Sequence, residues 1–150
     1  MSEGFREVVR LLGTNLDGTK KVVYALRGIK GVGINLAHVV VRVAGIDESK
    51  RLGQLSDSEL KKIEDILLNP LDYGIPHWML NRQKDPRTGE HLHLLGPDLD
   101  LAVRQDIELM KETGSWKGLR HSLGLKVRGQ KTRTTGRKGR TVGVVRRRKR

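Results

Sequence analysis

Basic side chains interleaved with glycine and threonine fill the last part of the chain. The candidates for nucleic-acid contact there are Lys117, Arg120, His121, Lys126, Arg128, Gln130, Lys131, Arg133, Arg137, Lys138 and Arg140. A terminal run follows, made of Arg146, Arg147, Arg148, Lys149 and Arg150. Arginine binds phosphate through two parallel hydrogen bonds and stacks on bases, and glycine lets a chain thread through a groove. The pattern favours a path along RNA over a localisation signal or an ordinary solvated segment.

The charge is divided unequally along the chain. Residues 1–113 carry 16 Lys and Arg against 17 Asp and Glu, whereas residues 114–150 carry 14 Lys and Arg and no acidic residue. The formal net charge of +13 therefore comes entirely from the second segment. Because soluble domains ordinarily mix their charges, this asymmetry predicts a polyanionic partner.

A second candidate contact is the glycine-rich segment 27–33 (RGIKGVG), which joins two predicted helices and is followed by Ala37. This matches the helix-hairpin-helix pattern. Its glycines let backbone amides approach a phosphate, and the start of the next helix offers unpaired N–H groups. With the basic tail attached, we predict RNA contact at Lys30, Gly31 and Gly33. A turn that only packs two helices is the alternative.

Other chemistries are poorly supported by the sequence. A Walker phosphate loop ends in Gly-Lys-Ser/Thr, but Gly33 is followed by Ile34. His91 and His93 could hold a metal only if Glu90 or Asp98 completed the site, because a site needs three or four ligands. There is no cysteine and no coherent set of acid, base and nucleophile. We therefore expect no catalysis, no cofactor and no metal.

The elements that must position the candidate groups are expected to be helices within residues 1–113. Thr19 is expected to cap the first helix, and Gly45 to end the second. Ser56 and Glu59 fit a capping box at the start of the third, and Pro70 should end it. The predicted class is mainly α: a helical N-terminal domain containing the helix-hairpin-helix element, followed by an extended basic tail over 114–150.

Residues 70–97 are expected to be an irregular loop insertion, because they hold all four prolines. The side chains expected to tuck this loop onto the core are Ile75, Trp78, Met79 and Leu80. A fourth helix should begin near Asp98 or Asp100, carry one apolar stripe and end at Gly114. The stripe consists of Leu99, Ala102, Val103, Ile107 and Met110. Burial against this helix is the favoured role of Trp116, with base stacking as the alternative.

Several segments resemble a known family. They are 118–121 (GLRH), 127–132 (VRGQKT), 134–137 (TTGR), 31–33 with Ala37, and 44–47 (AGID). Together they resemble the universal small-subunit ribosomal protein thirteen family, which is called small-subunit protein eighteen in eukaryotes. The segment 75–85 (IPHWMLNRQKD) resembles the archaeal and eukaryotic branch of that family.

The resemblance implies a structural constituent of the small ribosomal subunit, bound to its rRNA in the head. It implies a neighbour of the small-subunit protein nineteen family, and contacts to the large-subunit protein five family and large-subunit rRNA across the subunit interface. The family's tail runs toward the peptidyl-site tRNA, which implies tRNA proximity for the terminal cations. An architectural DNA-binding protein is the alternative that the hairpin pattern alone would allow.

The expected location is the cytoplasm, in association with the ribosome. The N-terminus lacks the apolar run of a signal peptide, and no stretch approaches the roughly 18 apolar residues of a membrane span.

Overall fold

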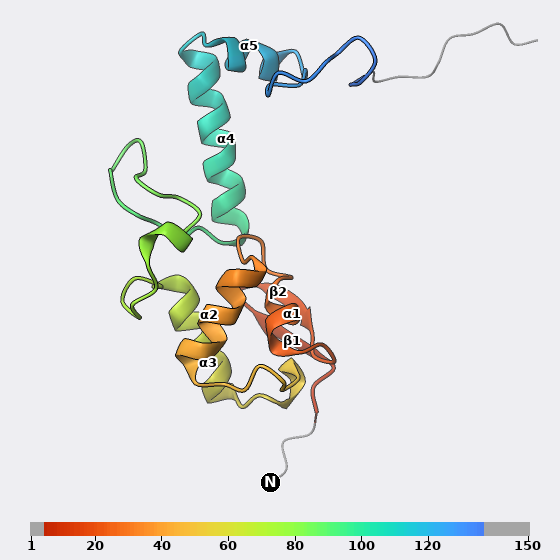
Figure 1. The fold of residues 1–150 in the computed structure, drawn as a ribbon, viewed down its shortest axis with the longest axis vertical. Helices are drawn as coiled ribbons and strands as arrows, with labels where there is room; N and C mark the ends of the chain where they lie inside the picture. Colours follow the sequence, from red (N-terminus) through yellow and green to blue (C-terminus); the bar gives the residue numbers. More distant parts are fainter. Residues whose placement is uncertain (1–4, 137–150) are drawn as a thin grey trace, which may run out of the picture. The chain divides into compact units, whose positions relative to one another are not determined.

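The computed structural model describes residues 5–136, which fall into two compact units divided between Ala102 and Val103. The elements in chain order are β1 (Val8–Leu11), β2 (Thr14–Asp17), α1 (Val22–Leu26), α2 (Ile34–Ala44), the 3-10 turn η1 (Leu52–Gln54), α3 (Asp57–Leu68), the 3-10 turn η2 (His77–Met79), α4 (Gly96–Glu112) and α5 (Trp116–Ser122) (Figure 1). The predicted mainly helical N-terminal domain is confirmed. Helix α4 begins in the first unit and continues into the second.

A two-stranded hairpin precedes the helices, where no element was predicted. β1 and β2 pair antiparallel, with Val8 opposite Asp17 and Leu11 opposite Thr14. Val9, Leu11 and Leu16 enter the core, whereas Val8 is exposed. Each strand has only four residues, which is too short for a period-2 alternation to stand out in the sequence.

The start of the first helix differs from the prediction. Thr19 does not cap α1; its backbone N–H and its hydroxyl both donate to Asp17 Oδ1, at 2.9 and 2.6 Å. Lys21 occupies the N-cap position and makes no side-chain cap bond. Thr19 therefore shapes the turn that leaves β2, because a short polar side chain bonds equally well within a turn.

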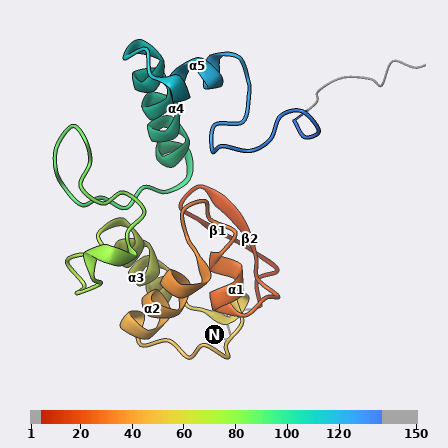
Figure 2. The same cartoon turned by 45° about the horizontal axis from the view of Figure 1, so that its top comes forward.

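Helix α2 packs against both α1 and α3, as the two ribbon views show (Figures 1 and 2). Its buried stripe is Leu36, Ala37, Val40, Val41 and Ala44. The helix stops at Gly45, as predicted, because Gly45 adopts a left-handed φ of 74° and its amide returns to the carbonyls of Arg42 and Val41. Leucine, isoleucine and valine side chains from the strands, the helices and η1 complete the core.

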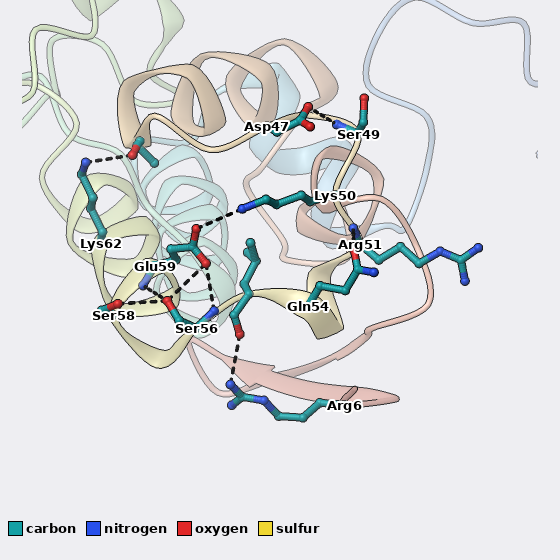
Figure 3. A network of polar contacts seen from close by, with 12 residues as sticks. Arg6, Asp47, Ser49, Lys50, Arg51, Gln54, Ser56, Ser58, Glu59 and Lys62 are labelled. Atoms are coloured by element: carbon teal, nitrogen blue, oxygen red, sulfur yellow. Dashed lines mark hydrogen bonds and ion pairs between the residues drawn. The ribbon is translucent and has the colours of Figure 1, made fainter. Parts of the chain in front are cut away.

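The predicted capping box opens α3 (Figure 3). The Glu59 amide donates to Ser56 Oγ at 3.3 Å, and the Ser56 amide donates to Glu59 Oε2 at 2.9 Å. Lys50 Nζ lies 3.5 Å from Glu59 Oε1, and Lys62 Nζ donates to the carbonyl of Ala44 at 2.8 Å. These contacts tie α3 to the segment that follows α2. The helix ends at Leu68, two residues before Pro70, as predicted.

Between α3 and α4 the chain is irregular but anchored. Ile75 and Leu80 are buried, whereas Trp78 is 65% exposed, so its expected burial was wrong. Asn81 fastens the loop, because its side chain donates to the Leu94 carbonyl at 2.6 Å and accepts from the Leu94 amide at 2.9 Å. The side-chain amide of Asn81 both donates and accepts, so it holds two segments of the loop together as a pair of backbone hydrogen bonds would.

Helix α4 begins at Gly96, slightly earlier than predicted, and ends at Glu112 close to Gly114, whose φ is 62°. Only Ala102 is buried along it. Val103 is 48% exposed, so the predicted stripe does not form one covered face in the described residues.

The tail does not start as an extended segment, because residues 116–122 form α5. Trp116 is 70% exposed, which overturns its expected burial against α4. The small residues around it explain the helix. Ser115 caps α5 by accepting from the Gly118 amide at 3.2 Å, and Gly118 is buried. Residues 123–136, the rest of the tail that the structure describes, contain no helix or strand.

Candidate nucleic-acid interface

The turn between α1 and α2 places the first group of predicted contacts. Ile29 and Val32 are buried, so the apolar positions of the motif hold the two helices together. Gly31 has a φ of 100°, and a Cβ there would lie 2.5 Å from the Leu94 carbonyl oxygen. Glycine is therefore required at residue 31 both by the backbone conformation and by the close approach of the loop before α4.

Gly33 occupies a different environment from Gly31. It is the N-cap of α2, in an extended conformation, and a Cβ there would meet open space. Helix α2 begins without a side-chain cap bond and without an acidic residue in its first turn. The first backbone N–H groups of α2 are consequently available, together with the positive end of the helix dipole, to bind an anion.

Lys30 lies beside this helix start but is engaged in an ion pair. Its Nζ is 2.6 Å from Asp100 Oδ2 at the beginning of α4, and both side chains are exposed. An exposed pair contributes little stability, so a phosphate can compete for Lys30. Asp100 is thus a neighbour of the predicted contact that sequence spacing did not indicate, since 70 residues separate the two.

The tail presents the second group of predicted contacts. Lys117, Arg120 and His121 lie on α5, and the Arg120 guanidinium carbon is 5.9 Å from the centre of the Trp116 ring. Arg120 Nε also donates to the Lys126 carbonyl.

Beyond α5, the Gln130 side chain accepts from the Arg128 amide at 3.0 Å, and the Thr135 hydroxyl donates to the Lys131 carbonyl. Both bonds are local, so they shape turns of the tail. Lys126, Arg128, Lys131 and Arg133 are all exposed. The remaining candidates, Arg137, Lys138, Arg140, Arg146, Arg147, Arg148, Lys149 and Arg150, lie outside the described residues.

No acidic residue follows Glu112 in the sequence. Carboxylates of the tail itself therefore cannot neutralise its cations. An RNA backbone carries closely spaced negative charges that hold condensed counterions. Those counterions are released when cationic side chains bind the phosphates.

The histidines of the loop do not form a metal centre. The His77 and His91 rings contact each other at a tilt of 38°, with ring centres 4.8 Å apart. Burial holds the pKa of His93 below its ordinary value, and both of its ring nitrogens are buried with no hydrogen-bond partner. Across residues 5–136, no group of three or more His, Asp or Glu side chains is placed to hold a metal ion.

Trp116 is exposed, contrary to its predicted burial against α4. Its spacing from Arg120 places both on one side of a helix, and Ser115 before it is a preferred cap residue. These two signals could have indicated a capped helix with an exposed ring.

None of the helices in the described part of the chain is both long and apolar enough to cross a membrane.

A small helical body joined to a cationic segment that lacks acidic residues is typical of nucleic-acid-binding proteins. Residues 10–138 match the profile of the family described as ribosomal protein S13/S18. The chain is 55% identical over 148 residues to the small ribosomal subunit protein uS13 of Staphylothermus marinus, with 99% of this chain and 98% of that protein covered. The chain therefore belongs to the ribosomal protein S13/S18 family.

Two further relatives carry the same name. The protein of Hyperthermus butylicus is 56% identical over 140 residues, which cover 93% of each chain. That of Saccharolobus solfataricus is 52% identical over 146 residues, which cover 97% of this chain and 88% of that protein. The predicted family and its archaeal branch are confirmed. The prediction of a protein that is not an enzyme is confirmed as well, because the family consists of ribosomal structural proteins.

Proposed function

We propose that this chain is a structural constituent of the small ribosomal subunit in the cytoplasm and binds small-subunit rRNA in the head. The observation that carries the proposal is the match, over nearly the whole chain, to proteins named for the small subunit. The charge asymmetry supports it, because residues 114–150 carry 14 basic and no acidic side chains.

The body binds RNA through the helix-hairpin-helix element in this proposal. The α2 N-terminus faces a phosphate with its uncapped amides, and Gly33 leaves space for the approach. Lys30 leaves its ion pair with Asp100 and pairs with the phosphate instead. Gly31 acts indirectly, since it lets the turn pack beneath the Leu94 carbonyl.

The tail supplies most of the electrostatic affinity. Its arginines contact phosphates in pairs of hydrogen bonds, and its glycines allow the path to follow a groove. Residues 1–113 carry nearly balanced charge, so the body contributes shape and position rather than net attraction. The division of labour proposed here is between residues 1–113 and residues 114–150.

The protein and tRNA contacts of the proposal follow from the family resemblance. They comprise a neighbour of the small-subunit protein nineteen family, and the large-subunit protein five family with large-subunit rRNA across the interface. The terminal run Arg146–Arg150 approaches the peptidyl-site tRNA in the same proposal. Five adjacent cations suit a tRNA backbone chemically.

Sedimentation of a cell extract tests the proposal. The chain is followed by immunoblot across a gradient, before and after a moderate salt wash. We expect it to travel with the small subunit in both gradients. A chain that stays at the top, or that follows chromosomal DNA, would contradict the proposal and favour an architectural DNA-binding protein.

A further inference from the structure

Helix α5 presents an aromatic ring and a cation on the side opposite its packing contact. The contact is Gly118, where a Cβ would lie 2.0 Å from the Met110 carbonyl oxygen at the end of α4. Each residue turns an α-helix by about 100°. Trp116 and Arg120, two residues before and after Gly118, therefore lie on the opposite side of α5, where Trp116 is exposed and Arg120 is partly exposed.

Trp116 and Arg120 already form a cation–π pair. The guanidinium carbon lies 5.9 Å from the ring centre, within the range of a cation–π contact. The bond from Arg120 Nε to the Lys126 carbonyl holds the guanidinium in place. Trp116 is 70% exposed, so most of its side chain remains accessible despite the contact with Arg120.

The charge around the ring selects the kind of partner. Lys117 and Arg120 place positive charge next to Trp116 on α5, and no acidic residue follows Glu112. A flat apolar surface bordered by cations fits a base and its phosphate together. Leu119 on this helix and Leu123 at its C-cap are exposed, at 49% and 65%. They would suit an apolar protein surface, but the charges beside them favour a polyanion.

We propose that Trp116 and Arg120 form a stacking site for one unpaired nucleobase of RNA, with the indole as the platform and Lys117 beside the phosphate. The site deepens the proposed rRNA-binding function and rests on it. The exposed Trp78 serves as the internal comparison. It lies in the loop between α3 and α4, where the nearby Arg82 pairs with Asp85 at 2.6 Å.

Fluorescence of the full chain tests the site directly. The chain has two tryptophans, so the W78F variant reports on Trp116 alone. It is titrated with single-stranded oligoadenylate about 12 nucleotides long, and with a blunt RNA duplex that carries the same number of phosphates. We expect strong quenching of the Trp116 emission by the single strand and little change with the duplex.

Affinity measurements on three variants complete the test. W116L keeps an apolar side chain but removes the aromatic plane, and we expect it to weaken oligoadenylate binding about tenfold. W116F should retain most of the affinity, and W78L should match the parent chain. The salt dependence should be the same in all of them, because none changes the charge. Far-ultraviolet circular dichroism confirms that each variant is folded.

Three outcomes would overturn the site. The stacking site is rejected if W116L binds oligoadenylate as tightly as the parent and the W78F variant shows no quenching. In that case, salt-dependent RNA binding by the parent still upholds the proposed rRNA-binding function. W116L that binds oligoadenylate normally but no longer sediments with the small subunit assigns this face to a protein partner instead. Failure of the parent chain to bind any RNA rejects the proposed function together with the site.

Discussion

Gly118 lies so close to the backbone carbonyl of Met110 that a Cβ at residue 118 would be 2.0 Å from the oxygen. Ser115 completes the corner, because its hydroxyl donates to the same oxygen at 2.7 Å and accepts from the Gly118 amide. We expect Gly118→Ala to displace α5 and to increase hydrogen exchange of its amides about tenfold or more, since the obstacle is backbone rather than a movable side chain.

Lys117→Ala is the matched control for Gly118→Ala, because residue 117 is exposed on the same helix. Thermal unfolding of the first unit should not change in either variant, since the core cluster lies within residues 9–95. Unchanged exchange of α5 in Gly118→Ala would show that the corner does not depend on this contact.

The capping box makes Ser56 a stabilising residue of the body. Ser56→Ala removes the acceptor of the Glu59 amide, and we expect a loss of about 1 kcal/mol in the free energy of unfolding. Ser49→Ala is the control, because Ser49 contacts Asp47 through its backbone amide. Urea unfolding of the two variants measures the difference in the free energy of unfolding. Equal stability of the two would show that the Ser56 cap does not stabilise α3.

Glu59 predicts how stability depends on pH. The bond from the Ser56 amide, followed by the Ser56 hydroxyl and Lys50, holds the pKa of the Glu59 carboxyl below its ordinary value. A lowered folded-state pKa stabilises the folded protein at pH values above the unfolded-state pKa of about 4.3. This contribution is lost as the pH falls through the folded-state pKa. Stability should therefore decrease below about pH 5.

Glu59→Gln isolates this effect, because glutamine can still accept the Ser56 amide without titrating. The variant should lose less stability than the parent between neutral pH and acid, as measured by urea unfolding at several pH values. Identical pH profiles would mean that Glu59 ionisation is not coupled to folding.

The Lys30–Asp100 pair predicts a gain in RNA affinity. Asp100→Asn releases Lys30 from its ion pair, so affinity for small-subunit rRNA should rise about two- to fivefold at low salt. Asp98→Asn is the control for the general loss of negative charge on α4. Equal effects of the two variants would show that Lys30 itself does not reach a phosphate.

The tail should determine the salt dependence of RNA binding. If about half of its cations contact phosphates, log affinity falls against log salt with a slope of roughly −5 to −6. A chain that ends at Thr113 keeps the core and should lose most of this slope. RNA titrations over a range of potassium chloride concentrations measure it, and undiminished affinity of the shortened chain would contradict the assignment.

Local patterns were sufficient for much of the body. The capping box at Ser56, the left-handed stop at Gly45 and the limit before Pro70 depend on residues within a few positions of one another, so they can be recognised in the sequence. The hairpin was missed because its strands are short. Thr19 was misassigned because a cap and a turn use the same hydroxyl chemistry.

The sequence by itself determined the family, the mainly helical class and the segregation of charge, because each is a property of residue types along the chain. Only the tertiary structure decided that Lys30 pairs with Asp100, that Leu94 covers Gly31, and that Trp116 faces solvent beside Arg120. The first two contacts join residues far apart in the chain. The third depends on which side of α5 meets α4, and a buried glycine reveals that side only when its neighbour is known.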